Sequence, residues 1–297
     1  MAIPFPRALL STVVAILVAA TGSCAESAEA DSPPRPELYL PGVVSLPDRH
    51  EFGVAVSADE TEVYFGVDTG EKVEIWWTRR RGDRWSESEP LLQDPNIGFN
   101  DPTLDLPEKR LYFISTAAAP GAAPGTPPNA DIWYLERRAE GWSEPIHTGP
   151  VINTDKDEYY ISFTDGGDLY FSSNVRATRK GNYDLYFSPN ARTAPEPPVR
   201  LGPGVNSGAY EADPFIAPDG TYLIFAAGRR SGLGRGDLHI SFRGAGGAFE
   251  KSINLGAPVN TEHHELCPFV SRDGRYFYFT SNQDIYRIST EELWRHR

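Results

Sequence analysis

Short stretches of alternating apolar and polar residues recur along most of this chain. Leu111 and Phe113 are separated by one residue, so in an extended strand both side chains point to the same face. Dipeptides such as Asp219-Gly220 suit the tight turn of a β-hairpin. The 27 Gly and 26 Pro residues favour many short strands over long helices, and only the end of the chain, "EELWRHR", has a helical pattern. The pattern predicts an all-β protein.

The same strand–turn–strand pattern occurs five times. Each copy begins with an acidic residue, continues as an apolar strand and a polar turn, and ends in an aromatic strand. The copies are "EFGVAVSADETEVYF" (51–65), "DPTLDLPEKRLYF" (101–113), "EYYISFTDGGDLYF" (158–171), "EADPFIAPDGTYLIF" (211–225) and "ELCPFVSRDGRYFYF" (265–279). A catalytic centre needs its residues once, so five copies indicate a unit of architecture.

Each copy is followed by a second signature, "EIWW", "DIWY", "DLYF", "DLHI" or "DIYR", and several units close on "VINT", "VNS" or "VNT". The unit therefore contains four short strands, named a to d, and repeats about every 50 residues. Four antiparallel strands repeated around an axis describe the blade of a β-propeller. The fold class expected is an all-β, five-bladed β-propeller, and a six-bladed form is the alternative.

The fifth unit has no strand d after "DIYRIST", whereas the segment "PELYLPGVVS" (36–45) stands before the first unit. Leu40 precedes Glu51 at nearly the spacing that separates Leu201 from Glu211. We therefore expect the N-terminal segment to supply the missing outer strand of the last blade. This pairing would close the ring and leave no open sheet edge. Residues 36–297 are expected to form one propeller domain.

The combined pattern of acidic opening, Asp-Gly turn, "LYF", "DIY" and "VNT" resembles the WD40-like repeat of TolB, the periplasmic propeller of the bacterial Tol system. Many exported bacterial proteins carry similar units. The resemblance covers nearly all of residues 36–290 and implies a periplasmic or outer-membrane binding protein. It implies no enzymatic activity and no cofactor. TolB-type proteins have a further N-terminal domain before the propeller, whereas here the propeller follows a short polar segment.

The N-terminal residues are expected to direct export. Arg7 precedes an uncharged apolar stretch at residues 8–20, which reads as the core of a signal peptide at residues 1–24. "TGSC" (21–24) resembles a lipobox, in which Cys24 is lipidated; ordinary cleavage after Ala25 is the alternative. Residues 25–35 are acidic and contain Pro, as in a tether. The expected location is periplasmic or on the outer membrane as a lipoprotein, with secretion as the alternative.

Charge and cysteine content narrow the range of partners. The net charge of −13 would repel nucleic acid, so none is expected as a partner. Contact with a membrane is expected only through the lipid anchor, and the protein is expected to be a monomer. Cys24 and Cys267 are the only cysteines, and if Cys24 is removed or lipidated no disulfide forms. Cys267 is interpreted as a small buried side chain.

Candidate binding residues cluster on one predicted face of the propeller. The b–c loops are long and dissimilar, and variation on a rigid frame is typical of binding sites. Strand a is expected to line the central channel, with the b–c and d–a loops at one mouth and the a–b and c–d loops at the other. The acidic residues that open strand a would then form a ring at the b–c/d–a mouth: Glu51, Asp101, Glu158, Glu211 and Glu265.

Three roles remain open for these carboxylates. They bind backbone amides of a neighbouring blade, or they hold a divalent cation at the channel mouth, or two of them act as the acid pair of a glycoside hydrolase. No cofactor is expected apart from that cation, and whether there is a metal site is left open. His263 and His264 are adjacent and would point apart in an extended loop, so they do not form a common metal site by themselves.

Arg229 and Arg230 form a basic stretch in the fourth b–c loop. We expect this loop to be solvated, and binding of an acidic partner is the alternative. The sequence contains no "GxSxG", no "HExxH" and no paired "CxxC". The function expected is that of an exported, non-enzymatic binding protein whose ligand is a protein or a glycan of the cell envelope. The alternative is a carbohydrate-active enzyme, a glycoside hydrolase or polysaccharide lyase, that uses the acidic face.

Overall fold

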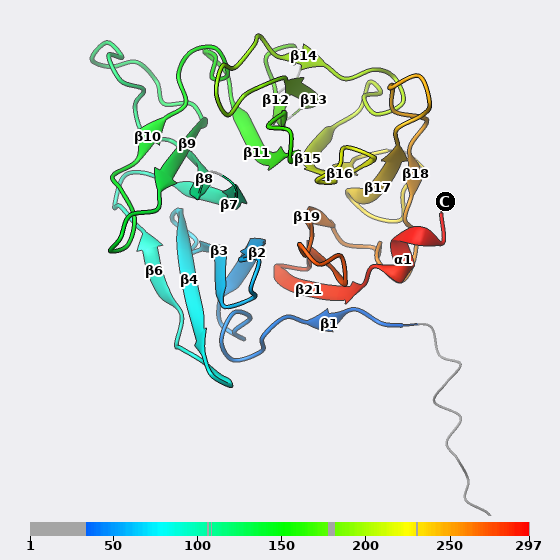
Figure 1. The fold of residues 1–297 in the computed structure, drawn as a ribbon, viewed down its shortest axis with the longest axis horizontal. Coiled ribbons are helices and arrows are strands. Elements are labelled where there is room, and N and C mark those ends of the chain that lie inside the picture. Colours follow the sequence, from blue (N-terminus) through cyan, green and yellow to red (C-terminus); the bar gives the residue numbers. More distant parts are fainter. Residues whose placement is uncertain (1–33, 106, 108, 178–181, 230, 297) are drawn as a thin grey trace, which may run out of the picture. The chain divides into compact units, whose positions relative to one another are not determined.

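The computed structural model describes residues 34–297 except 106, 108, 178–181, 230 and 297. Five antiparallel sheets stand around a central axis, as Figure 1 shows, so the all-β, five-bladed propeller is confirmed. The described part of the chain has one short helix, α1 (Glu291–Trp294). It lies in the segment where the sequence has its helical pattern.

Each blade is a sheet whose strands follow one another from the centre outward. Blade 1 contains β2 (His50–Val56), β3 (Glu62–Asp68), β4 (Val73–Arg81), β5 (Arg84–Trp85) and β6 (Glu89–Leu92). Blade 2 contains β7 (Phe99–Asp105), β8 (Arg110–Ser115), β9 (Asp131–Glu136) and β10 (Ile146–His147). Blade 3 contains β11 (Glu158–Phe163), β12 (Leu169–Ser173), β13 (Asp184–Ser188) and β14 (Val199–Arg200).

Blade 4 contains β15 (Glu211–Ile216), β16 (Tyr222–Ala227), β17 (Asp237–Phe242) and β18 (Ile253–Asn254). Blade 5 contains β19 (Leu266–Val270), β20 (Tyr276–Ser281) and β21 (Asp284–Ser289), and its outer strand is β1 (Glu37–Leu38) from the other end of the described chain. Glu37 is paired with Arg287 and Leu38 with Tyr286 in the antiparallel register. The expected closure of the ring by the N-terminal segment is therefore confirmed.

The hydrophobic core lies between neighbouring blades. Five buried clusters each join two adjacent sheets; one of them, for example, packs Val54 and Phe65 of blade 1 against Tyr278 and Ile285 of blade 5. Strands b and c supply side chains to both faces, because each middle strand is covered on either side by another blade. This explains why the b strands read as nearly continuous apolar runs and not only as alternating ones.

All five inner strands contain a bulge near their start. The bulged residue has a positive φ in every blade: Gly53 (56°), Asp101 (50°), Tyr160 (48°), Asp213 (53°) and Cys267 (53°). Four of these residues are not glycine, although a left-handed backbone is costly for residues with a Cβ atom. The surrounding sheets hold this conformation, and the bulge redirects one side chain per blade at the same level of the channel.

Candidate functional site

Three of the repeated glutamates hold the loop that precedes their own strand. Glu158, Glu211 and Glu265 are 0% exposed. Each accepts a backbone N–H and a hydroxyl from a Thr or Ser four residues earlier, namely Thr154, Ser207 and Thr261. The motif "N-[ST]-x-x-x-E" is thus a loop clamp. Its Asn, as at Asn260, binds both the N–H and the C=O of Leu238 in strand c.

The structure does not place the five predicted carboxylates in one ring. Phe99, not Asp101, occupies the position in blade 2 that corresponds to Glu158, since Phe99 pairs with Ser115 as Glu158 pairs with Ser173. Asp101 lies two residues further along the strand, at the bulge. The expectation that Asp101 is equivalent to the glutamates is therefore wrong. The clamp glutamates and the bulge residues therefore occupy two different levels of the channel, whereas the sequence pattern treated Asp101 as a clamp position.

The bulge residues of different blades contact one another across the channel. The Asp101 carboxylate lies 3.8 Å from the Cys267 thiol, and Cys267 N–H donates to Asp213 at 3.3 Å. A Cβ atom at Gly53 would lie 3.4 Å from the Asp101 carboxylate, so the absence of a side chain in blade 1 makes room for it. Cys267 is buried, as the sequence predicted, and is a free thiol within the described part of the chain.

Asp101 and Asp213 bring two carboxyl groups into a site with little water. Burial raises the pKa of Asp101 to about 8, and the negative charge of Asp213 adds to the shift. Burial also raises the pKa of Asp213 to about 6, and the N–H of Cys267 opposes that shift. Near neutral pH Asp101 is therefore mostly protonated and Asp213 mostly ionised. One of the two groups can donate a hydrogen bond while the other accepts one.

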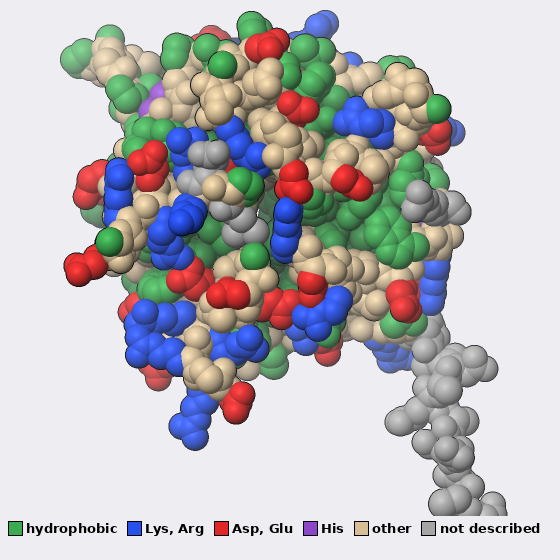
Figure 2. Space-filling view, in the orientation of Figure 1, with side chains coloured by type: hydrophobic (Ala, Val, Ile, Leu, Met, Phe, Trp, Pro, Cys, Tyr) green, Lys and Arg blue, Asp and Glu red, His purple; other side chains and the backbone are tan. Residues whose placement is uncertain are grey.

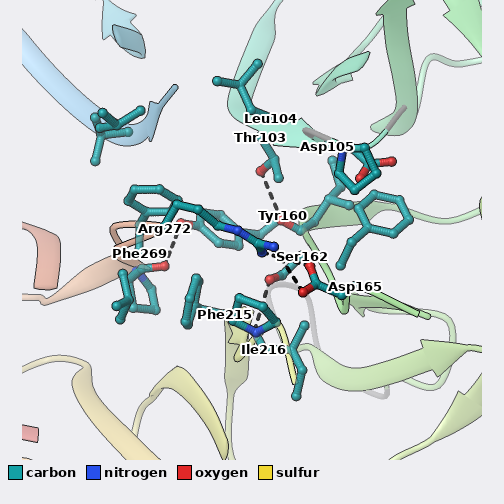
Figure 3. Close-up of a pocket in the computed structure, with 18 of the residues that line it drawn as sticks. Thr103, Leu104, Asp105, Tyr160, Ser162, Asp165, Phe215, Ile216, Phe269 and Arg272 are labelled. Atoms are coloured by element: carbon teal, nitrogen blue, oxygen red, sulfur yellow. Dashed lines mark hydrogen bonds and ion pairs between the residues drawn. The ribbon is translucent and has the colours of Figure 1, made fainter. Parts of the chain in front are cut away.

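Tyr160, the bulge residue of blade 3, bridges the channel. Its hydroxyl crosses from blade 3 to blade 5 and donates to the carbonyl oxygen of Pro268 at 3.0 Å. On the a–b/c–d side of this bridge lies a small cavity of about 80 Å³, shown in Figure 3. Its walls come from the inner strands of all five blades and include Phe215 and Phe269. This mouth is narrow and largely apolar.

Ion pairs between blades cover the apolar mouth. Arg272, in the a–b turn of blade 5, donates to both carboxylate oxygens of Asp165 in blade 3, at 2.7 and 3.0 Å (Figure 3). Arg192 binds Asp105 in the same way between blades 3 and 2. Each guanidinium therefore already has a carboxylate partner at this mouth.

The opposite mouth contains a larger and more polar cavity. It has a volume of about 350 Å³ and lies between blades 4, 5 and 1, on the b–c/d–a side. Strand residues and loop residues contribute equally to its wall. The lining residues are His50, Glu51, Phe52, Asp68, Arg235, Glu262, His263, His264, Leu266, Thr280, Asn282 and Gln283. The structure brings Glu51, His263 and His264 together here, as expected for this face, but not the other four predicted acids. We refer to this space as the loop cavity.

The two histidines differ in their surroundings. His263 is exposed, and its backbone oxygen accepts from Arg235 N–H. His264 packs against Gly236, where a Cβ atom would lie 2.4 Å from the imidazole ring, so only glycine fits. Burial lowers the pKa of His264, and its Nε2 has no hydrogen-bond partner among the described residues. His264 is therefore a neutral group beside the loop cavity.

Glu51 is the one repeated glutamate without the loop clamp. Pro47 stands four residues before it, where the other blades have Thr or Ser, so neither a hydroxyl nor an N–H is offered. Arg49 binds one carboxylate oxygen at 2.5 Å, and the other oxygen has no partner in the described part of the chain. Burial raises the pKa of Glu51 to about 7, and Arg49 opposes that shift. Burial raises the pKa of Glu158 to about 7 as well, so Glu51 differs from its three counterparts in its hydrogen-bond partners.

Arg229 does not project from its loop. Its side chain is 20% exposed; one terminal nitrogen donates to the Ser252 hydroxyl and the other to the Val205 carbonyl oxygen. It also approaches Glu211 at 3.4 Å. Arg229 therefore supports the fourth blade, contrary to the expectation of a solvated basic loop. Arg230 and Cys24 lie outside the described residues.

Sequence reasoning missed several residues that the structure places at these sites. The predicted site residues do not include Asp213 in the channel or Asp68 and Glu262 in the loop cavity. Two positions after the opening acid stand Gly53, Tyr160, Asp213 and Cys267 in four repeats, but Thr103 in the second, because its opening Asp101 is itself the bulge residue. Nothing in the sequence pairs Asp68 with Glu262, which lie 194 positions apart.

The geometry of the site limits its chemistry. No group of three or more His, Cys, Asp or Glu side chains in the described part could hold a metal ion. Among the same residues, no helix has the length and apolar character needed to cross a membrane. The fold and the site therefore define a five-bladed β-propeller with a closed channel, an apolar mouth and a polar loop cavity.

Comparison with known proteins agrees with this class. No protein-family model and no curated protein matches the sequence. Among solved structures, TolB from Acinetobacter baumannii is similar, with a TM-score of 0.51 and 15% identity over 84% of this chain and 56% of that protein. A putative TolB from Agrobacterium tumefaciens has a TM-score of 0.50 and 13% identity, over 80% of this chain and 72% of that one. The TolB-like propeller fold expected from the repeats is thus confirmed.

Carbohydrate-active propellers are equally similar in fold. A thermostable family-43 glycoside hydrolase has a TM-score of 0.53 and 13% identity, with 83% of this chain and 90% of that enzyme covered. An endo-arabinase from Bacteroides thetaiotaomicron has a TM-score of 0.52 and 15% identity, with 83% and 95% covered. At these identities the likenesses show the fold alone. This chain spans little more than half the length of the Acinetobacter TolB.

Proposed function

We propose that this protein is an exported, non-enzymatic binding protein and that the loop cavity holds one unit of a cell-envelope glycan. The observation that carries the proposal is the difference between repeated and non-repeated residues. Three of the repeated acids form the hydrogen bonds of the loop clamps. The loop cavity, in contrast, is lined by residues that differ from blade to blade. Residues that the fold does not need are the ones available for a ligand.

The lining of the loop cavity suits a sugar. Its volume of about 350 Å³ is at the small end of the range of ligand pockets. Asp68, Glu262, Arg235 and Asn282 offer planar polar groups that can hydrogen-bond to neighbouring hydroxyls, and Phe52 offers an apolar surface. A sugar ring has both polar edges and apolar faces. A peptide from an envelope protein is the other ligand in keeping with this lining, and the experiment below separates the two.

Export rests on the sequence. The apolar stretch at residues 8–20 precedes a small-residue segment, as in a signal peptide. In this proposal Cys24 carries a lipid and residues 25–35 tether the propeller to the periplasmic side of the outer membrane. A Cys24→Ser variant would then lose membrane association. Unchanged fractionation together with an N-terminus at Glu26 would instead indicate ordinary secretion.

The second candidate is a carbohydrate-active enzyme. It is favoured by Asp101 and Asp213, two buried carboxyl groups in the channel whose pKa values of about 8 and about 6 differ. Paired acids in different protonation states are typical of glycoside hydrolysis. Against this role, Tyr160 bridges the channel in the same layer, and neither Asp lines the loop cavity. We therefore place the ligand in the loop cavity and assign no catalytic residue.

A binding assay with residues 34–297 tests the proposal, since this unit contains all five blades and the closing strand. The protein is applied to an array of bacterial envelope glycans and to peptides of envelope proteins. We expect glycan binding that Arg235→Ala with Glu262→Ala weakens at least about tenfold, as both side chains are exposed and line the cavity. Mass spectrometry monitors cleavage of the bound glycan. Cleavage that Asp101→Asn abolishes would favour the second candidate, a carbohydrate-active enzyme. Binding of peptides but of no glycan would contradict the proposal that the ligand is a glycan.

A further inference from the structure

The hairpin between β4 and β5 in blade 1 carries an unusual concentration of positive charge. Arg79, Arg80, Arg81 and Arg84 are all exposed and flank a turn at Gly82, whose φ is +60°. With Asp83, the segment 79–85 has four basic residues and one acidic residue, a net charge of +3 in a chain of −13. The β4 end projects from the rim of the ring in Figure 1, and Lys and Arg side chains gather there in Figure 2.

Equivalent hairpins in other blades use their arginines differently. In blade 2, Arg137 pairs with Glu62 and Arg138 with Glu136. In blade 4, Arg243 donates to the backbone oxygens of Gly220 and Gly247. In contrast, none of the four hairpin arginines of blade 1 has a carboxylate partner in the described part of the chain. Glu62 lies directly opposite Arg79 in the sheet, but it is already bound by Arg137.

The register of the hairpin brings like charges together. Arg81 is paired directly with Arg84 across the two strands, next to the turn. Like charges in directly opposite positions destabilise an antiparallel pair. An anion between the two guanidinium groups would turn this repulsion into attraction. The hairpin thus has an electrostatic cost that a bound anionic group removes.

Aromatic residues stand behind the arginines. The Arg80 guanidinium lies 5.8 Å from the ring of Trp85, and that of Arg79 lies 5.6 Å from the ring of Trp77. Both indoles are half-buried. Tryptophan beside basic residues suits the boundary between water and a lipid headgroup layer. The planar fork of arginine also matches the geometry of phosphate oxygens.

We propose that the β4–β5 hairpin docks the propeller on a membrane surface through the phosphate groups of anionic phospholipids. A projecting tip cannot enclose a small anion, but it can lie against a plane that carries many phosphates. β1, where the described chain begins, lies along the same side of the ring as this tip in Figure 1. The docking is a contact additional to the expected lipid anchor, and it does not depend on the ligand of the loop cavity.

Vesicle co-sedimentation of residues 34–297 tests the docking, because this unit contains neither the apolar stretch at residues 8–20 nor Cys24. Vesicles of phosphatidylcholine with about 30 mol% phosphatidylglycerol are compared with pure phosphatidylcholine. We expect sedimentation with the anionic vesicles only, at about 50 mM NaCl, and its loss at about 500 mM, where charges are screened. Arg81→Gln with Arg84→Gln should weaken the binding at least about tenfold.

The matched control is Arg138→Gln with Arg275→Gln. It removes the same charge from two exposed arginines that already pair with Glu136 and Asp273. Its effect on vesicle binding should be under about twofold. An unchanged melting temperature shows that the hairpin variant is folded. Equal binding by the two double variants, no binding by the wild type, or displacement by about 1 mM inorganic phosphate would overturn the proposal.

Discussion

The two mouths of the channel are built from different parts of the same repeat. The a–b/c–d mouth is lined by the inner strands themselves, which meet there as a small apolar cavity under ion pairs. The b–c/d–a mouth contains the larger, polar cavity, whose wall combines loop residues with residues of β2, β3, β19 and β20. Strand positions are constrained by packing in every blade, whereas loop positions are not. Chemistry that is not repeated is therefore found at the loop end.

Between the two mouths, the bulge layer shows how symmetry is broken. All five blades place one residue with positive φ there, yet the residues are Gly, Asp, Tyr, Asp and Cys in blades 1 to 5. Backbone geometry is thus repeated where side-chain chemistry is not. The three variants that follow probe the apolar mouth, the loop clamp and the bulge layer in turn, in order of decreasing effect.

The largest effect is expected at the apolar mouth. Phe215 is buried, lines the small cavity and belongs to the core between blades 4 and 5. Phe215→Ala should lower the free energy of unfolding by about 3–5 kcal/mol, because it leaves a cavity that the rigid sheets cannot fill. Denaturant unfolding measures the loss. Leu233→Ala, at an exposed loop position, is the control and should cost less than about 0.5 kcal/mol. A loss below about 1 kcal/mol at Phe215 would mean that this mouth is not part of the packed core.

An intermediate effect is expected for the loop clamp. Glu265 accepts the N–H and the hydroxyl of Thr261 and the hydroxyl of Ser281. Glu265→Gln puts an NH₂ group against one of these donors and should cost about 2–3 kcal/mol in unfolding free energy.

Glu51→Gln is the matched control for the clamp, since one oxygen of Glu51 has no partner among the described residues and Arg49 can bind the amide oxygen. It should cost less than about 1 kcal/mol near pH 6. The pKa of Glu51 is raised to about 7 from 4.5, so its stabilising contribution is lost as the pH rises through 7. Above pH 7 the Gln variant should therefore gain stability relative to the wild type. Equal losses of unfolding free energy in Glu265→Gln and Glu51→Gln would mean that the clamped and the unclamped glutamate do not differ in their contribution to stability.

The smallest effect is expected in the bulge layer. The pKa of Asp101 is raised to about 8 from 3.8, so its contribution to stability is fully present below pH 3.8 and is lost as the pH rises through 8. Asp101→Asn cannot ionise and should be more stable than the wild type at pH 8.5, by about 1–2 kcal/mol, with little difference near pH 5. Thermal unfolding at the two pH values measures this. A variant less stable than the wild type at pH 8.5 would show that the ionised carboxylate is held by a favourable partner.

The repeats allowed much of the fold to be predicted. The five copies, the four strands in each and the outer strand supplied by residues 36–45 were all legible, because each blade must bury the same faces against its neighbours. The residues of the candidate site were harder to predict from the sequence. Glu51, His263 and His264 were placed on the correct face, but Arg229 was read as a solvated loop residue although it is bonded inside blade 4.

The sequence by itself determined the architecture, since strand period, turn residues and repeat length follow from local chemistry. Only the tertiary structure decided which acidic residues are equivalent. A single bulged residue moves Asp101 into the channel layer and puts Phe99 in the place of the clamp glutamate. The register of paired strands sets this, and spacing along the chain does not reveal it. The loop cavity likewise joins residues from opposite ends of the propeller sequence, which meet only because the ring closes.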